Sequence, residues 1–136
     1  MRYRNFGYLL VSMVIAAPLA APLWAHHSFS AQYDSSKPVS LTGAVTKVEW
    51  MNPHVYFYID VRDEQSGKVA NWAFEMGAPA VIQRNGWTRN SMKIGDLVIV
   101  EGTRAKSGAN HGNARSVTMK STGKKLGAGS SENVTP

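Results

Sequence analysis

The sequence predicts a mainly β protein, a five-stranded barrel with one short helix between its third and fourth strands. Three observations carry this prediction. Apolar and polar residues alternate with a period of two over residues 54–61, and the pattern recurs over residues 69–75. A segment that begins with proline and ends with glycine, residues 79–86, then separates these strands from a later apolar run. Strict alternation places every second side chain on one face, as in a sheet with one buried side.

The first predicted strand, residues 41–50, changes parity near its middle. Leu41 and Val45 occupy odd positions, whereas Val48 occupies an even one. One extra residue in a β-bulge near residues 46–47 would produce this shift and would also bend the strand. We therefore expect a long, bent first strand that runs into a turn containing Pro53.

The second strand, residues 54–61, shows the clearest alternation. Its odd positions from Val55 to Val61 are all apolar and predict a buried face. The opposite face carries His54, Tyr56, Tyr58 and Asp60. A polar hairpin loop then leads to the third strand, residues 69–75, in which Trp72 and Phe74 share a face.

The remaining segments predict one helix and two strands. Proline suits the first helical position and glycine the position past the end, so Pro79 to Asn85 predicts about two turns of helix. Residues 97–100 form an apolar run that predicts a fourth strand buried on both faces. A weaker fifth strand, residues 114–119, follows the loop 106–113, and residues 121–136 are rich in Gly, Ser and Lys, which predicts a disordered tail.

This order of elements, three strands, a helix and two strands, is that of the OB-fold. The OB-fold is a Greek-key barrel that binds ligands through its second and third strands and the loops that flank them. We expect it to occupy residues 26–120.

The first 25 residues have the pattern of a cleaved signal peptide. Arg2 and Arg4 precede an uncharged apolar run over residues 6–21, and the small residue Ala25 suits cleavage after it, which would make His26 the mature N-terminus. An uncleaved membrane anchor is the alternative, but two prolines near the end of the run disfavour it. Cleavage lowers the formal net charge from +6 to +4, and the periplasm is the expected location.

Four motifs resemble a family of exported proteins of unknown function from Gram-negative bacteria. They are Ala25-His-His-Ser-Phe29 after the signal peptide, residues 45–55 (VTKVEWMNPHV), residues 71–75 (NWAFE) and residues 94–96 (IGD). The resemblance covers nearly the whole mature chain and implies no known activity. The order of elements is also similar to that of periplasmic bacterial OB-fold stress-tolerance proteins.

The histidines are the candidate metal ligands. They are His26, His27, His54 and His111. A mature N-terminal histidine offers its amine and a ring nitrogen, and a further imidazole completes a nitrogen set that suits Cu(II). In an OB-fold, His54 and His111 would lie in the loops that flank the binding surface, where they could be neighbours. Exposed histidines without a metal are the alternative reading.

An aromatic surface is the second candidate site. Its residues are Trp50, Asn52, His54, Tyr56 and Tyr58, with Glu75 beside them. OB-folds use such surfaces to bind oligonucleotides or oligosaccharides. The alternative is that the tyrosines are ordinary strand formers and that the tryptophans fill the barrel.

These features predict a non-catalytic binding module. The sequence lacks the nucleophile elbow, the phosphate-binding glycine loop and the HExxH zinc motif, and it contains no cysteine. Export and the modest charge disfavour nucleic acid, and no membrane association is expected after cleavage. The expected partner is a small molecule, a glycan or a periplasmic protein; the alternative function is copper handling through His26 with His54 or His111.

Overall fold

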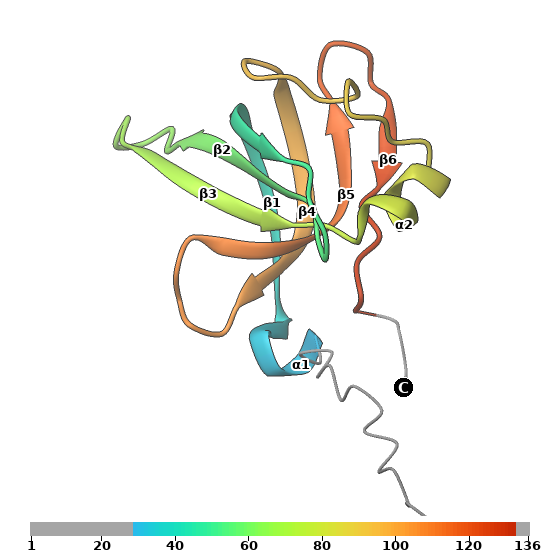
Figure 1. Cartoon of the computed structure of the whole chain (residues 1–136). Helices are drawn as coiled ribbons and strands as arrows, with labels where there is room; N and C mark the ends of the chain where they lie inside the picture. The colour runs from blue at the N-terminus through green and yellow to red at the C-terminus, as the bar shows by residue number, and fades with distance from the viewer. Residues whose placement is uncertain (1–28, 133–136) are drawn as a thin grey trace, which may run out of the picture.

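Six strands and two short helices build the part of the chain that the computed structural model describes, residues 29–132 (Figure 1). In chain order they are α1 (Phe29–Gln32), β1 (Tyr33–Glu49), β2 (Tyr56–Arg62), β3 (Val69–Glu75), α2 (Pro79–Arg84), β4 (Leu97–Ala105), β5 (His111–Met119) and β6 (Lys125–Gly127). The predicted signal peptide, with His26 and His27, lies outside this range. Within it, neither helix is long and apolar enough to cross a membrane.

The strands close into a barrel. Their order in the sheet is β3-β2-β1-β4-β5-β6, and an additional pairing joins β3 to β5. This closing pair is parallel and short, with Ala73 opposite His111 and Glu75 opposite Asn113, whereas the other pairs are antiparallel. The ring of five strands with α2 between β3 and β4 confirms the predicted OB-fold-like barrel.

Strand β1 is bent because it pairs with both halves of the barrel. Its first part, from Tyr33 to Ala44, pairs with β4, and its second part, from Ala44 to Glu49, pairs with β2. The register with β2 shifts between Val45 and Lys47, which confirms the predicted bulge. The strand begins well before residue 41, in a polar segment that carries no strand pattern.

The buried face of each strand is the one that alternation predicts. Phe57 and Ile59 of β2 and Phe74 of β3 are fully buried, and the two phenylalanine rings stack with centroids 5.6 Å apart. Helix α2 packs against this core through Ile82, which is also fully buried. The tyrosines of β2 therefore face outward.

The last two strands differ from their prediction. Leu97 is 46% exposed, so residues 97–100 are not buried on both faces. Strand β4 continues to Ala105, and β5 begins at His111 instead of Ala114. Apolar runs do not mark the polar ends of these strands: that of β5 is held by the closing pair with β3, and that of β4 by its pairs with β1 and β5. His111 thus belongs to a strand and not to a loop.

The C-terminal segment is more ordered than its composition predicts. Up to residue 132 it packs on the barrel: β6 pairs with β5, Ala128 is fully buried, and the Trp87 indole N–H donates to the Gly127 carbonyl at 2.9 Å. These contacts use backbone atoms and small residues, which carry no hydrophobic signal in a sequence.

Gly102 tests the packing between β4 and β5. A Cβ added there would lie 2.1 Å from the Asn113 carbonyl oxygen, and backbone cannot move away as a side chain can. We expect Gly102→Ala to lower the free energy of unfolding by at least about 1–3 kcal/mol, the usual cost of overpacking. The control is Gly127→Ala, whose Cβ would meet nothing closer than 3.7 Å and should cost less than about 0.5 kcal/mol in urea unfolding.

Candidate functional site

Side chains from three strands and one loop meet around the carboxylate of Glu75, the last residue of β3. Tyr33 and Tyr56 donate their hydroxyl protons to Oε2 at 2.8 and 2.9 Å. The His54 ring lies against the other oxygen, with Nδ1 2.9 Å from Oε1. His111 joins the group through Tyr33, with its Nε2 3.3 Å from the hydroxyl oxygen. We call these five residues the Glu75 cluster.

Strand geometry brings the cluster together on the outer face of the barrel. Glu75 follows the buried Phe74, so its side chain points outward. Tyr56 is its direct cross-strand partner in β2, and the closing pair with β5 brings His111 opposite Ala73. The start of β1 then places Tyr33 over the same face, where it is 2% exposed.

Hydrogen bonds hold a buried negative charge in this cluster. Glu75 is only 6% exposed, and a buried carboxylate is tolerated when donors satisfy it. Burial, and then the charge of Glu75, raise the pKa of the Tyr33 hydroxyl. Burial and the hydrogen bond to Glu75 raise the pKa of the Tyr56 hydroxyl. Both phenols therefore remain protonated donors at neutral pH.

The same hydrogen bonds assign the tautomers of the two histidines. Tyr33 has one proton and gives it to Glu75, so His111 donates its Nε2 proton to the Tyr33 oxygen and keeps a bare Nδ1. His54 donates from Nδ1 to Glu75, and in the neutral form of this ring Nε2 is the accepting nitrogen. Burial lowers the pKa of His111, which favours its neutral ring. The cluster thus presents ring nitrogens that accept hydrogen bonds.

Three of the predicted site residues belong to the cluster: His54, Tyr56 and His111. Tyr58, by contrast, donates to Glu49 at 2.8 Å, and the Lys47 ammonium lies over its ring. Asn52 is exposed in the loop between β1 and β2. The hydroxyls of Tyr56 and Tyr58 are therefore held by carboxylates, and Lys47 lies over the Tyr58 ring.

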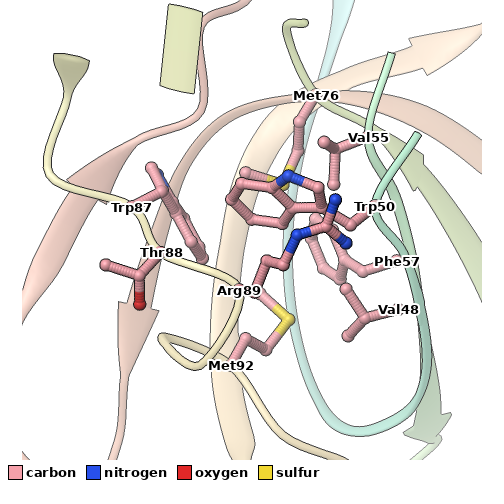
Figure 2. A pocket seen from close by; sticks show the side chains of 9 residues that line it. All are labelled: Val48, Trp50, Val55, Phe57, Met76, Trp87, Thr88, Arg89 and Met92. Carbon is pink, nitrogen blue, oxygen red and sulfur yellow. The ribbon is translucent and has the colours of Figure 1, made fainter. Parts of the chain in front are cut away.

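Trp50 lines a separate apolar hollow beneath the loop between α2 and β4. Figure 2 shows its indole among Trp87, Met76 and Met92, with the Arg89 guanidinium over its ring at 5.7 Å. The free volume is about 10 Å³, which is room for about one water molecule. This hollow is packed core and holds no ligand of useful size.

Metal ligation has limited support within residues 29–132. No three side chains of the histidine, aspartate and glutamate type lie close enough there to hold a metal ion. His54 and His111 contact the same network but through different atoms of it. The other two candidate ligands, His26 and His27, lie outside the described residues.

Sequence reasoning underrated Glu75 and missed Tyr33. Glu75 was expected only beside the aromatic surface, although a charged residue at the end of an otherwise apolar strand is a usable signal. Tyr33 has no such signal, because it lies in a polar stretch far from the other cluster residues in sequence.

Comparison with known proteins gives a family match and a similar solved structure. Residues 14–115 match a family described as "Family of unknown function (DUF6152)". No curated protein matches the chain. A solved structure of Rim1, a mitochondrial single-stranded DNA binding protein from S. cerevisiae, is similar with 13% identity and a TM-score of 0.49. The similarity covers 62% of this chain and 93% of that one, and at this score it carries no argument about function.

Tyr33→Phe tests the cluster. Loss of a hydrogen bond to a buried carboxylate should lower the free energy of unfolding by about 1.5–3 kcal/mol at pH 7. Tyr58→Phe, which removes a bond to the more exposed Glu49, should cost less than about 1 kcal/mol. Equal losses in the two variants at pH 7 would contradict the special role of Glu75.

The stabilisation by Tyr33 should also depend on pH. The folded-state pKa of Tyr33 lies above the unfolded value of about 10, so its contribution is complete below pH 10 and declines as the pH rises further. The stability difference between wild type and Tyr33→Phe should therefore shrink above pH 10. Urea titrations over this range measure it.

Proposed function

The chain belongs to this family of unknown function, whose description names no activity, and we propose from the structure that it is an exported, non-catalytic OB-fold binding module. Its ligand is a polar small molecule or a glycan, bound at the Glu75 cluster. One observation carries this proposal: the cluster lies on the outer face of β2 and β3, beside the loop that holds His54 and the start of β5. This is the surface that OB-folds use for binding.

The cluster suits recognition of hydroxyl groups. The side chain of His54 is 42% exposed, and the Nε2 of its neutral form can accept a hydrogen bond from a ligand. The partly exposed ring of Tyr56 adds an apolar surface beside it. A sugar offers the same combination, hydroxyl donors around an apolar ring face. Glu75 fixes the orientation of both groups, which lowers the entropic cost of binding.

The chemistry of the cluster favours binding over turnover. An acid or base catalyst works best with a pKa near the operating pH, and the tyrosine hydroxyls are shifted away from neutrality. Glu75 already accepts three hydrogen bonds, which leaves it poorly placed to take a proton from a substrate.

Export is part of the proposal and rests on the sequence. The basic start and the apolar run before Ala25 are typical of a signal peptide. A chain without cysteine has no need of disulfide formation in the periplasm, and the packed barrel supplies its stability instead.

A panel of neutral oligosaccharides tests the binding surface. Titration of the mature protein, followed by NMR, should shift the signals of His54 and Tyr56 first. His54→Ala and Tyr56→Phe should each weaken binding about ten-fold, because each removes one hydrogen bond or its alignment. Tyr58→Phe lies on the same strand and outside the cluster, so it should bind as wild type does. Unchanged binding in both cluster variants, with wild-type stability, would refute the proposal.

Copper handling is a second candidate, favoured by the position of α1. Phe29 packs on Tyr33 with ring centroids 5.2 Å apart, and Lys106 donates its side-chain and backbone protons to the Ser30 and Gln32 carbonyls at 2.6 and 2.9 Å. These contacts hold α1 beside the cluster. Cleavage after Ala25 would start the chain three residues before Phe29, within about 10 Å of it. The terminal amine and His26 would then be available to a copper ion together with His54 or His111.

Two measurements test copper handling. Mass spectrometry of the exported protein should find His26 as its first residue; another start removes the amine from the proposed ligand set. Titration with Cu(II) should then show at least ten-fold weaker binding by His26→Ala than by wild type. Ser28→Ala, a nearby change outside the four candidate ligands, is the matched control. Affinity of the His26→Ala variant equal to that of wild type would mark the binding as adventitious.

A further inference from the structure

Arg104, next to the last residue of β4, has an unusual environment. Its guanidinium carbon lies 5.2 Å from the centre of the Trp72 ring, and its Nη2 donates to the Gly108 carbonyl at 3.0 Å. Its Nε is buried and has no hydrogen-bond partner. Within residues 29–132 it is the one buried side-chain nitrogen or oxygen of this kind. Buried polar atoms in native proteins are nearly always paired, so this donor calls for an explanation.

Arg104 also lacks a counter-ion among residues 29–132. The ion pairs among the described residues involve other cations, and none of them includes Arg104. Arg115 shows the contrast, because its guanidinium makes two hydrogen bonds to Glu132, at 3.1 and 2.9 Å. Arg89 stacks on a tryptophan as Arg104 does, but it has no buried unpaired nitrogen. Arg104 thus combines an unneutralised charge with an unused donor.

The surroundings of Arg104 leave backbone as well as side-chain groups open. Strand β3 pairs with β5 only over Ala73–Glu75, so in the described structure its first half, Val69–Trp72, has one unpaired edge. In Figure 1 the β2–β3 hairpin and the loop between β4 and β5 project from the same side of the barrel. Loop residues 106–110 are all exposed. The Gly108 carbonyl, which occupies Nη2 of Arg104, belongs to this exposed loop.

We propose that Arg104, seated on Trp72, binds an anionic group of the ligand, a carboxylate or a phosphate. A guanidinium presents Nε and one Nη as two parallel donors, which match the two oxygens of such a group. Binding would pair the buried Nε and neutralise the charge. This inference rests on the proposed function, since it places an anion subsite on the barrel that the Glu75 cluster marks as a binding module.

NMR of the mature protein, with the arginine Nε–H signals assigned, tests the subsite. The probes are inorganic phosphate, acetate and glucuronate at constant ionic strength. We expect the Arg104 signal to shift to saturation with at least one probe while the Arg89 and Arg115 signals stay in place. Phosphate and the two carboxylates form separate arms, so the stronger response identifies the class of anion.

Substitutions supply the matched comparison. Arg104→Lys keeps the charge but loses the paired donors and should weaken binding at least ten-fold, and Arg104→Gln should abolish it. Arg89→Lys changes the other arginine that lies over a tryptophan and should bind as wild type does. Thermal melts confirm that each variant is folded; if Arg104→Gln is not, the lysine variant decides.

The opposing outcomes are distinct from those of the proposed function. Equal, unsaturable shifts at all arginines would mean an adventitious ion only and would overturn the subsite. Unchanged affinity in Arg104→Lys would do the same. If the Arg104 signal does not shift with any anion, but His54→Ala loses oligosaccharide binding, the anion subsite is refuted and the proposed binding module stands. If Arg104 binds an anion, but oligosaccharide binding is unchanged in the cluster variants, the anion subsite stands and the proposed oligosaccharide surface is refuted.

Discussion

The parallel pairing of β3 with β5 is the constraint on which the site depends. It is only three residues long on β3, yet it closes the barrel and fixes His111 and Asn113 beside the end of β3. Gly112 makes this approach possible, because a Cβ there would lie 2.8 Å from the Phe74 ring and 3.0 Å from the Thr103 carbonyl. The side chains of His111 and Glu75 can then share one network although they are far apart in sequence. Without this closure, β3 would be the edge strand of an open sheet, and nothing would hold Glu75 beside β5.

The opposite charges of Glu75 and Arg104 lie on different sides of strand β3 and do not form an ion pair with each other. Glu75 lies on the outer face and is held mostly by neutral donors, so its negative charge is spread over hydrogen bonds and is not cancelled by lysine or arginine. Arg104 lies over Trp72, whose side chain points to the core. Burying charges without direct neutralisation costs stability. The sheet itself keeps the two groups from forming an internal ion pair.

Sequence patterns predicted the parts of the fold that depend on burial. Alternation identified the buried residues Phe57 and Phe74, parity identified the bulge after Val45, and Pro79 marked the start of α2. The parts that depend on backbone pairing remained hidden, such as the polar start of β1 and the order around β6. The residues of the site also fall into those that a local pattern predicts and those that it does not. His54 and Tyr56 follow from strand 2 alone, whereas Tyr33 reaches Glu75 only through the tertiary path of β1, which no local pattern encodes.

The two sides of the Glu75 cluster differ in exposure. Under the proposed function, this difference decides which histidine a ligand would meet. Tyr33 is almost fully buried and covers Glu75 from the side of α1, so a ligand cannot approach the carboxylate from there. His111 lies behind the Tyr33 hydroxyl, and burial lowers its pKa, which keeps the ring neutral and makes it a structural support for Tyr33. His54 is the exposed partner on the opposite oxygen. Glu75 therefore links the more buried Tyr33–His111 pair to the more exposed His54, so under the proposed function a hydroxyl or a metal ion would meet the Nε2 of His54 first.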